Sequence, residues 1–533
     1  MLALKSLVFA LLLGIMIWPA FYNEQPFFFP DTTAYIRAAD LGVQSLTHHT
    51  TPWSVSAEDK DGGGQDSADD SGTKRVNSVK DKTVFSGRSP YYGVLLYLGE
   101  VTGGFWISIT LQALALLVAL AWALRALELP TWPHLLWIGI VIATTTSASF
   151  FASFLMPDVF AALTILGCSV LIGVPRRLST VDYSIWLLLL AASLMFHDSH
   201  TLIAATLLLL GFTWNLLTRR WSNWRGLGFI GFALLLAACA QLVFDFTVQR
   251  VVGASPLRLP FLMARVIEDG PGYRFLRDTC PSSGFQVCDY VDRLPMSSSE
   301  FLWGSEMNRG VFAQSSPEVR RALSTEQVGF LLAVIEYDPI GQMSASLRNI
   351  GLQLSALRLR DFEYDEEEKR VFAIKIPVEY LDTLRRSAAY RHALPLGFFS
   401  SVILVTFICG GAFSTYMLLS PRRSGVRRAV GAAQPIRASS RMAAPLDSVS
   451  ISANVSITIG LEGGGPQDID GDVETVASVQ TIWQRRMRSG KTGGNEPQCL
   501  RADTTDILNR WPILRVANCT ESPTAFPCAR SAT

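Results

Sequence analysis

The chain has 533 residues, of which 49% are hydrophobic and only 17% are charged, and its formal net charge is +1. Soluble domains usually carry about a quarter charged residues, so this composition is typical of a membrane protein. The small net charge gives no general attraction to nucleic acid, and we expect no nucleic-acid partner.

The apolar segments predict a mainly α-helical, polytopic membrane protein. A membrane-spanning helix needs about 20 mostly apolar residues. Eight segments approach this requirement: 4–22, 104–126, 134–153, 157–174, 184–197, 199–217, 226–245 and 394–419. The first of them is also compatible with a signal peptide, but no A-x-A cleavage site follows it, so we interpret it as an uncleaved anchor.

Asp31 follows the first predicted span by a few residues, in the stretch "FFFPDTTAYIRAADLG" (27–42). Pro30 and Asp31 can simply begin a helix, with the Asp31 side chain as its N-cap. A carboxylate at the membrane edge is also well placed to act as a general base. The two interpretations are compatible, and Asp31 is the predicted catalytic residue.

The first outer loop contains a stretch rich in Gly, Ser and Asp, and we expect residues 54–85 to be flexible. The acids in 59–70 match a calcium-binding loop only loosely, so a solvated linker is the better interpretation. Arg88, in "SGRSPYYG" (86–93), lies between this linker and the second span. It is either an anchor at the membrane interface or a ligand for an anionic phosphate.

Two further polar sites border the apolar segments. Asp158 opens the fourth predicted span, where it is a candidate N-cap. His197, Asp198 and His200 belong to the turn "HDSH" between two spans. This turn is a hydrogen-bonded turn, a contact for an anionic head group, or part of a metal site, for which two histidines do not suffice. We predict no metal site.

The segment 246–393 mixes charged and apolar residues, and we expect a small extracytoplasmic cap domain there. Within it, the apolar spacing of residues 324–357 predicts one or two helices, which either lie on the membrane or pack on their own domain. Cys280 and Cys288 lie in the same segment, on the side of the membrane where disulfides are allowed. We predict that these two cysteines are paired.

The end of the chain differs from the rest. Residues 420–533 are rich in Ser, Gly, Arg and Thr and lack apolar periodicity, so we expect a disordered tail. The predicted organisation is a transmembrane core (1–245), the cap domain (246–393), a last transmembrane helix (394–419) and a disordered cytoplasmic tail (420–533).

Basic residues in the short loops predict one orientation, because cytoplasmic loops carry an excess of Lys and Arg. With the N-terminus inside, the clusters "PRRLS" (175–179), "TRRWSNWR" (218–225) and "SPRRSGVRR" (420–428) all fall in the cytoplasm. We therefore expect a multi-pass protein of a bacterial inner membrane with both termini in the cytoplasm. Asp31, Asp158 and the "HDSH" turn then share the outer face.

The order of these features resembles the N-terminal membrane half of GT-C superfamily glycosyltransferases, such as protein O-mannosyltransferases and the aminoarabinose transferases of lipid A. The likeness covers about residues 1–245: a first span, an acid soon after it, "GRSPYYGVLLYLG" before the second span, a span that begins with "PD", and a short hairpin. It implies a polyprenyl-phosphate sugar donor and Asp31 as catalytic base or metal ligand. A divalent metal is compatible with this chemistry but not required, and no cofactor is specified.

The resemblance implies transfer of a sugar from the polyprenyl-phosphate donor to a lipid, glycan or protein acceptor at the outer face of the inner membrane. The residues expected near the donor phosphate are Arg88, Asp158, His197, Asp198 and His200. The chain departs from the family in having fewer spans and no second acid next to Asp31. Its cap segment resembles uncharacterised bacterial multi-pass membrane proteins.

Two other classes of protein compete with the enzyme. A non-catalytic multi-pass scaffold is the main alternative, because each site residue also has an adequate capping or anchoring role. A transporter is less favoured, because its spans should contain charged residues at mid-membrane, whereas the acids here lie at the interface.

Overall fold

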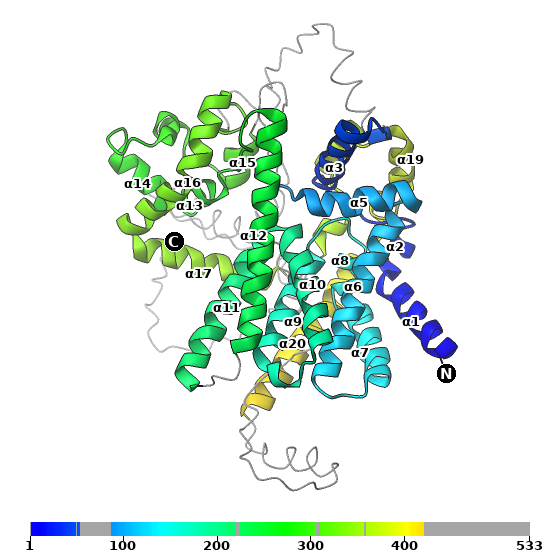
Figure 1. Ribbon diagram of the computed structural model, residues 1–533. Coiled ribbons are helices and arrows are strands. Elements are labelled where there is room, and N and C mark those ends of the chain that lie inside the picture. The colour runs from blue at the N-terminus through cyan, green and yellow to red at the C-terminus, as the bar shows by residue number, and fades with distance from the viewer. Residues whose placement is uncertain are drawn as a thin grey trace, which may run out of the picture. The chain divides into compact units, whose positions relative to one another are not determined.

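The computed structural model describes residues 2–49, 51–53, 87–219, 224–304, 310–356 and 359–419. The predicted flexible loop (54–85) and the predicted disordered tail (420–533) lie outside these residues. The described part is mainly helical, as predicted, and its only extended pairing is one isolated β-bridge (Figure 1).

The described residues form a series of helices. In order they are α1 (Leu2–Met16), α2 (Trp18–Tyr22), α3 (Thr32–Thr47), α5 (Pro90–Gly103), α6 (Phe105–Ala126), α7 (Thr131–Thr145), α8 (Ala148–Ala152), α9 (Val159–Gly173), η1 (Pro175–Arg177), α10 (Thr180–Phe196), α11 (Asp198–Thr218), α12 (Trp224–Val252), α13 (Phe261–Glu268), α14 (Pro271–Thr279), η3 (Gln286–Arg293), α15 (Ser298–Trp303), α16 (Pro317–Tyr337), α17 (Pro339–Ser355), η4 (Arg360–Phe362), α18 (Glu366–Lys375), α19 (Val378–Arg386) and α20 (Leu396–Leu419).

Four of these helices, α6, α11, α12 and α20, are long and apolar enough to cross a membrane. Shorter apolar helices, α1, α7, α9 and α10, occupy the other segments predicted as spans. Two of the predicted spans are interrupted: 4–22 breaks at Ile17, between α1 and α2, and 134–153 breaks at Thr146, whose backbone is extended. The structure thus indicates a membrane protein, while helix length supports four of the eight predicted spans.

The long apolar helices differ in how much protein covers them. In the most apolar window of α6, 44% of the residues are buried, whereas in α20 only 6% are buried. An apolar helix that its own chain leaves uncovered needs another apolar environment. Lipid contact is the expected environment for α20.

Buried apolar residues form two clusters. The first joins the apolar helices to the segment around Phe27 and to residues 359–394, from which Phe362 and Tyr364 contribute. The second lies within residues 257–334. Residues 359–394, which the sequence groups with the cap domain, therefore share the core of the apolar helices.

The second cluster packs against the two cysteines of the disulfide and includes residues of α16. Cys280 and Cys288, which the sequence predicts to be paired, form a disulfide with a Cα–Cα distance of 5.5 Å. The predicted helical stretch 324–357 divides into α16 and α17 at Asp338, just before Pro339. Proline at the first helical position is favourable for the second helix.

α3 and α5 approach one another closely because Gly93 has no side chain. A Cβ atom at Gly93 would lie only 2.4 Å from the carbonyl oxygen of Tyr35. This close approach brings the start of α3, at Asp31, next to the residues that precede α5.

Candidate functional site

Two short segments with a common pattern lie side by side in the apolar core. The segment "FFFPD" (27–31) precedes α3, and "FLMPD" (154–158) precedes α9. Each segment has Phe first, then two apolar residues, then Pro and Asp, and each leads directly into a helix. Asp31 and Asp158 therefore occupy equivalent positions, and they are close enough to interact electrostatically.

A parallel β-bridge joins the two segments at Phe27 and Phe154. The Phe27 N–H donates to the Ser153 carbonyl at 3.0 Å, and the Leu155 N–H donates to the Phe27 carbonyl at 2.9 Å. The Thr32 hydroxyl adds a third bond by donating to the Leu155 carbonyl at 3.0 Å. The backbone thus fixes the position of both acids.

Asp31 precedes α3 as predicted, but its side chain does not cap the helix. Its backbone is helical (φ −74°, ψ −23°), whereas a capping residue is normally extended. The Asp31 carboxylate instead accepts a hydrogen bond from Arg88 Nη2, and the two side chains are 9% and 13% exposed. The N-cap interpretation of the Asp31 side chain is therefore wrong, and a buried ion pair takes its place.

Asp158 resembles Asp31 in backbone conformation but not in ion pairing. It precedes α9 with a helical backbone (φ −58°, ψ −35°), and its side chain makes no capping hydrogen bond. Its side chain is half-buried, and no cation forms an ion pair with it within the described ranges. The capping interpretation thus fails at Asp158 also.

Burial and charge act in opposite directions on the Asp31–Arg88 pair. Burial raises the pKa of Asp31 more than the Arg88 guanidinium lowers it, so the net direction is upward. Burial would lower the pKa of Arg88, but Asp31, Tyr35 and Asp158 together raise it above its ordinary value. Arg88 therefore stays cationic, and Asp31 is a stronger base than an exposed carboxylate.

Arg88 is positioned by the start of α5. The hydroxyl of Ser89, the next residue, caps the helix by accepting from the Tyr91 N–H at 3.2 Å. The same hydroxyl donates to the Met195 carbonyl at 2.5 Å, near the end of α10. This contact brings Arg88 within electrostatic range of His197.

The "HDSH" turn is held by its own hydrogen bonds. The Nδ1 atom of His197 accepts from the Ser199 N–H at 3.3 Å and so caps α11. His200 is 2% exposed, and its Nδ1 donates to the Ser193 carbonyl at 2.7 Å. Asp198 is exposed. Of the three interpretations of this turn, the structure shows the hydrogen-bonded turn. Among the ring nitrogens of His197 and His200, only the Nε2 atoms remain for a ligand.

No group of three or more His, Cys, Asp or Glu side chains suited to a metal ion occurs among the residues that the structure describes. Asp31 is engaged by Arg88, and His197 and His200 by their own turn.

Sequence reasoning missed Tyr35 and Lys375. Tyr35 lies one helical turn after Asp31, and its fully buried hydroxyl has no hydrogen-bond partner within the described part of the chain. Buried polar groups without partners are rare in native structures. The spacing of Asp31 and Tyr35 on one helix face was a usable signal. Nothing near Lys375 indicates its position.

Lys375 reaches the site because residues 359–394 pack over it. Tyr364 accepts a hydrogen bond from the Phe28 N–H at 2.9 Å. Arg37, in α3, donates to the Lys375 carbonyl. Burial lowers the pKa of Lys375, although the Asp31 carboxylate acts in the opposite direction. The same segment brings Asp361 within electrostatic range of Asp158.

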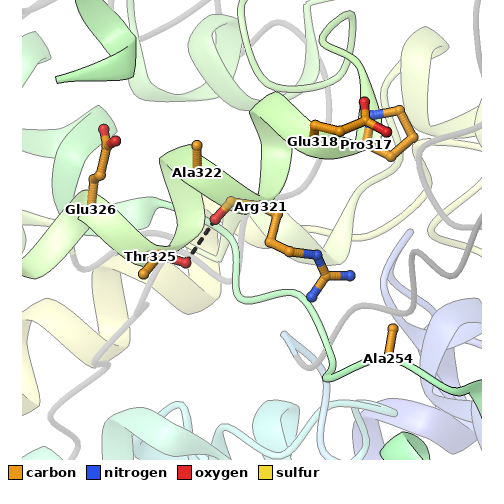
Figure 2. A pocket seen from close by; sticks show the side chains of 7 residues that line it. All are labelled: Ala254, Pro317, Glu318, Arg321, Ala322, Thr325 and Glu326. Carbon is orange, nitrogen blue, oxygen red and sulfur yellow. Dashed lines mark hydrogen bonds between the residues drawn. The ribbon is translucent and has the colours of Figure 1, made fainter.

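A separate open pocket of about 640 Å³ lies outside this site. It is lined by Ala254, Pro317, Glu318, Arg321, Ala322, Thr325 and Glu326 (Figure 2). Figure 2 also shows the Thr325 hydroxyl donating to the Arg321 carbonyl, at 2.8 Å. None of the predicted site residues lines this pocket.

Comparisons with models of protein families, with curated proteins and with solved structures find no match for this chain. The resemblance to GT-C glycosyltransferases therefore rests on features of the sequence alone. The residues that the fold brings together are a buried ion pair, a second carboxylate and a histidine-containing turn.

Proposed function

We propose that this chain is an integral membrane glycosyltransferase, which moves a sugar from a polyprenyl-phosphate donor to a lipid, glycan or protein acceptor. The observation behind the proposal is the buried Asp31–Arg88 pair at the starts of α3 and α5. Burying two charges is costly and contributes little to stability on balance, so a functional role explains the pair better. The pair supplies a carboxylate base and a phosphate ligand side by side.

Arg88 is the proposed ligand of the donor phosphate. A guanidinium binds phosphate through two parallel, charge-assisted hydrogen bonds. Phosphate bound at Arg88 competes with Asp31 for the same N–H groups, and it thereby releases the carboxylate. Donor binding thus prepares the base.

Asp31 is the proposed general base. Its carboxylate takes the proton of the acceptor hydroxyl or amine while the acceptor atom bonds to the anomeric carbon of the sugar. The bond from that carbon to the phosphate oxygen breaks, and its electron pair leaves with the polyprenyl phosphate. The upward-shifted pKa of Asp31 favours this proton transfer.

The other predicted site residues have supporting roles in this proposal. Asp158 lies within electrostatic range of Arg88. We assign its carboxylate to hydrogen bonds with hydroxyl groups of the sugar. The Nε2 atoms of His197 and His200 are assigned to the outer side of the phosphate, and the exposed Asp198 to the rim of the site. The site would face outward from a bacterial inner membrane, with both termini in the cytoplasm.

A non-catalytic membrane scaffold is the second candidate, and one observation favours it. The charges of Asp31 and Arg88 already neutralise one another. In a scaffold this pair would only join α3 to α5, with no need for a ligand.

Transfer assays on the full-length protein in lipid nanodiscs separate the two candidates. The donors are undecaprenyl-phosphate sugars with a radioactive sugar, and release of undecaprenyl phosphate is the readout. Asp31→Asn should reduce transfer by about 10²- to 10⁴-fold, which is the usual contribution of a general base. Glu24→Gln is the matched control, because Glu24 is a nearby acid that is 62% exposed and paired with Arg391.

A double variant controls for unfolding. Asp31→Asn leaves the Arg88 charge buried without its partner, whereas Asp31→Asn with Arg88→Gln removes both charges. The double variant should unfold at a temperature nearer to that of the unaltered protein and still be inactive. Full transfer by either variant, or no transfer by the unaltered protein with any donor, would exclude the proposed enzyme.

A further inference from the structure

α17 carries a row of apolar side chains that the rest of the chain leaves uncovered. The members of this row are 55% to 74% exposed: Ile340, Met343, Leu347, Ile350 and Leu354. They recur at intervals of three and four residues, which places them on one face of the helix. We call this face the α17 stripe.

The opposite face of α17 is fixed to its own domain. Ala345 is buried, and the Asn349 amide donates to Asp269 Oδ1 at 2.8 Å. At the start of the helix, Asp338 forms an ion pair with Arg274 at 2.5 Å. These contacts hold α17 with its polar side inward, so the stripe is not buried against its own domain.

The composition of α17 is unusual for a helix that faces water. Arg348 is its only charged residue, and it contains no acid. On α16, Val328, Leu332 and Ile335 are also 40% to 61% exposed and share one helix face. An exposed apolar surface of this kind, built from consecutive helices, indicates an interaction site.

The chain connects the end of α17 to a helix that can cross a membrane. The Leu359 N–H donates to the Ser400 hydroxyl at 3.3 Å, within the first turns of α20. Ser355, the last residue of α17, is only four residues from Leu359, a reach of at most about 14 Å. The C-terminal end of α17 therefore lies close to the N-terminal end of α20.

We propose that α17 lies on the membrane surface and inserts the α17 stripe between the lipid head groups. Helices with an apolar face and a polar face bind at this depth, parallel to the membrane. Arg348 is exposed, and its Nη2 donates to the Asp269 carbonyl at 3.4 Å, on the polar side of the helix. The proposal requires that α20 crosses the membrane, and it is independent of the proposed enzymatic function. A second copy of the chain is the other apolar occupant, and the test distinguishes it from lipid.

Photo-crosslinking on the full-length protein tests this proposal. The photoreactive residue p-benzoylphenylalanine replaces Leu347 or Ile350, and in a control it replaces Asp292, an exposed residue of η3. The purified protein is placed in nanodiscs of phosphatidylethanolamine and phosphatidylglycerol and illuminated. Its intact mass is then measured by mass spectrometry. We expect lipid adducts at positions 347 and 350 and none at position 292.

Two results would overturn the proposal. Covalent dimers at positions 347 and 350 would assign the stripe to a second copy of the chain, and equal lipid labelling at all three positions would remove any preference for lipid. A Leu347→Asn, Ile350→Asn variant adds an independent check, because both side chains are exposed and the fold should be retained. With the photoreactive residue at position 343, this variant should lose most of its lipid adducts; unchanged labelling contradicts the proposal.

Discussion

The segments 27–31 and 154–158 have the same local plan, but their acids have different surroundings. Both begin at a bridged phenylalanine, and both end in a helical Asp that does not cap the following helix. Asp31 forms an ion pair with Arg88, whereas Asp158 forms none within the described chain. The local sequence therefore determines the backbone at each acid, and a remote residue determines its chemistry.

The residues that follow the two acids sharpen this contrast. After Asp31, Thr32 and Thr33 use their hydroxyls to bind the carbonyls of Leu155 and Pro30. After Asp158, the corresponding residues are apolar and pack in the core. Hydroxyl groups thus hold the first segment in place, and apolar contacts hold the second.

The largest difference in the free energy of unfolding is expected between Asp31→Asn and Asp158→Asn. Asp31→Asn leaves the Arg88 charge without its partner, and breaking a buried ion pair in this way costs about 3–5 kcal/mol. Asp158→Asn removes a half-buried charge that has no ion-pair partner, so we expect no loss of stability. Thermal unfolding of both variants in detergent provides the measurement. Equal losses for the two variants would show that the ion pair does not distinguish the segments.

Gly93→Ala should separate α3 from α5 and so disturb the first segment only. The new Cβ would lie 2.4 Å from the Tyr35 carbonyl, and such overpacking costs about 1–3 kcal/mol. Gly42→Ala, on α3, is the control, because nothing lies within 4 Å of a Cβ at that position. The control should be neutral or stabilising. If thermal unfolding shows the same change for both variants, close packing at Gly93 is not important.

Thr32→Val places a valine directly after Asp31, as Val159 follows Asp158 in the second segment. It removes the hydrogen bonds that the Thr32 hydroxyl makes with the Phe29 N–H and the Leu155 carbonyl, and we expect a loss of about 1–2 kcal/mol. Thr47→Val is the control, since the Thr47 hydroxyl binds a carbonyl on the exposed surface of α3. Chemical unfolding should show a loss for Thr32→Val that is clearly larger than for the control, and equal effects would contradict the assigned role.

Local patterns in the sequence predict much of the helical structure but little of the site. Pro30 and Asp31 predict the start of α3, and the apolar segments predict where apolar helices form. The Asp31–Arg88 pair joins residues on either side of a long loop, and no pattern near either one encodes it. Lys375 is farther still along the chain. Its position depends on how residues 359–394 pack on the apolar helices, which is a tertiary contact without a local signal.

Helix breaks account for two of the four predicted spans that lack a long helix, 4–22 and 134–153. Composition alone treats 134–153 as one apolar run, but Thr146 and Ser147 separate α7 from α8. The Thr146 hydroxyl accepts from the Ala148 N–H at 3.2 Å. Side-chain bonds of this kind compete with the helix, and an average hydropathy does not detect them.

The most direct test of Asp31 as the base is the pH dependence of transfer in the unaltered protein and in Arg88→Gln. Transfer should fall as the pH drops through the pKa of Asp31, because only the carboxylate accepts a proton. Burial raises this pKa and Arg88 lowers it, so Arg88→Gln should move the acid limb of kcat/KM to higher pH, whatever the loss of rate. The control, Arg385→Gln, alters an exposed arginine of α19 and should leave the limb in place. An acid limb that is unmoved, or that moves to lower pH, in Arg88→Gln would contradict the assignment of Asp31 as the base.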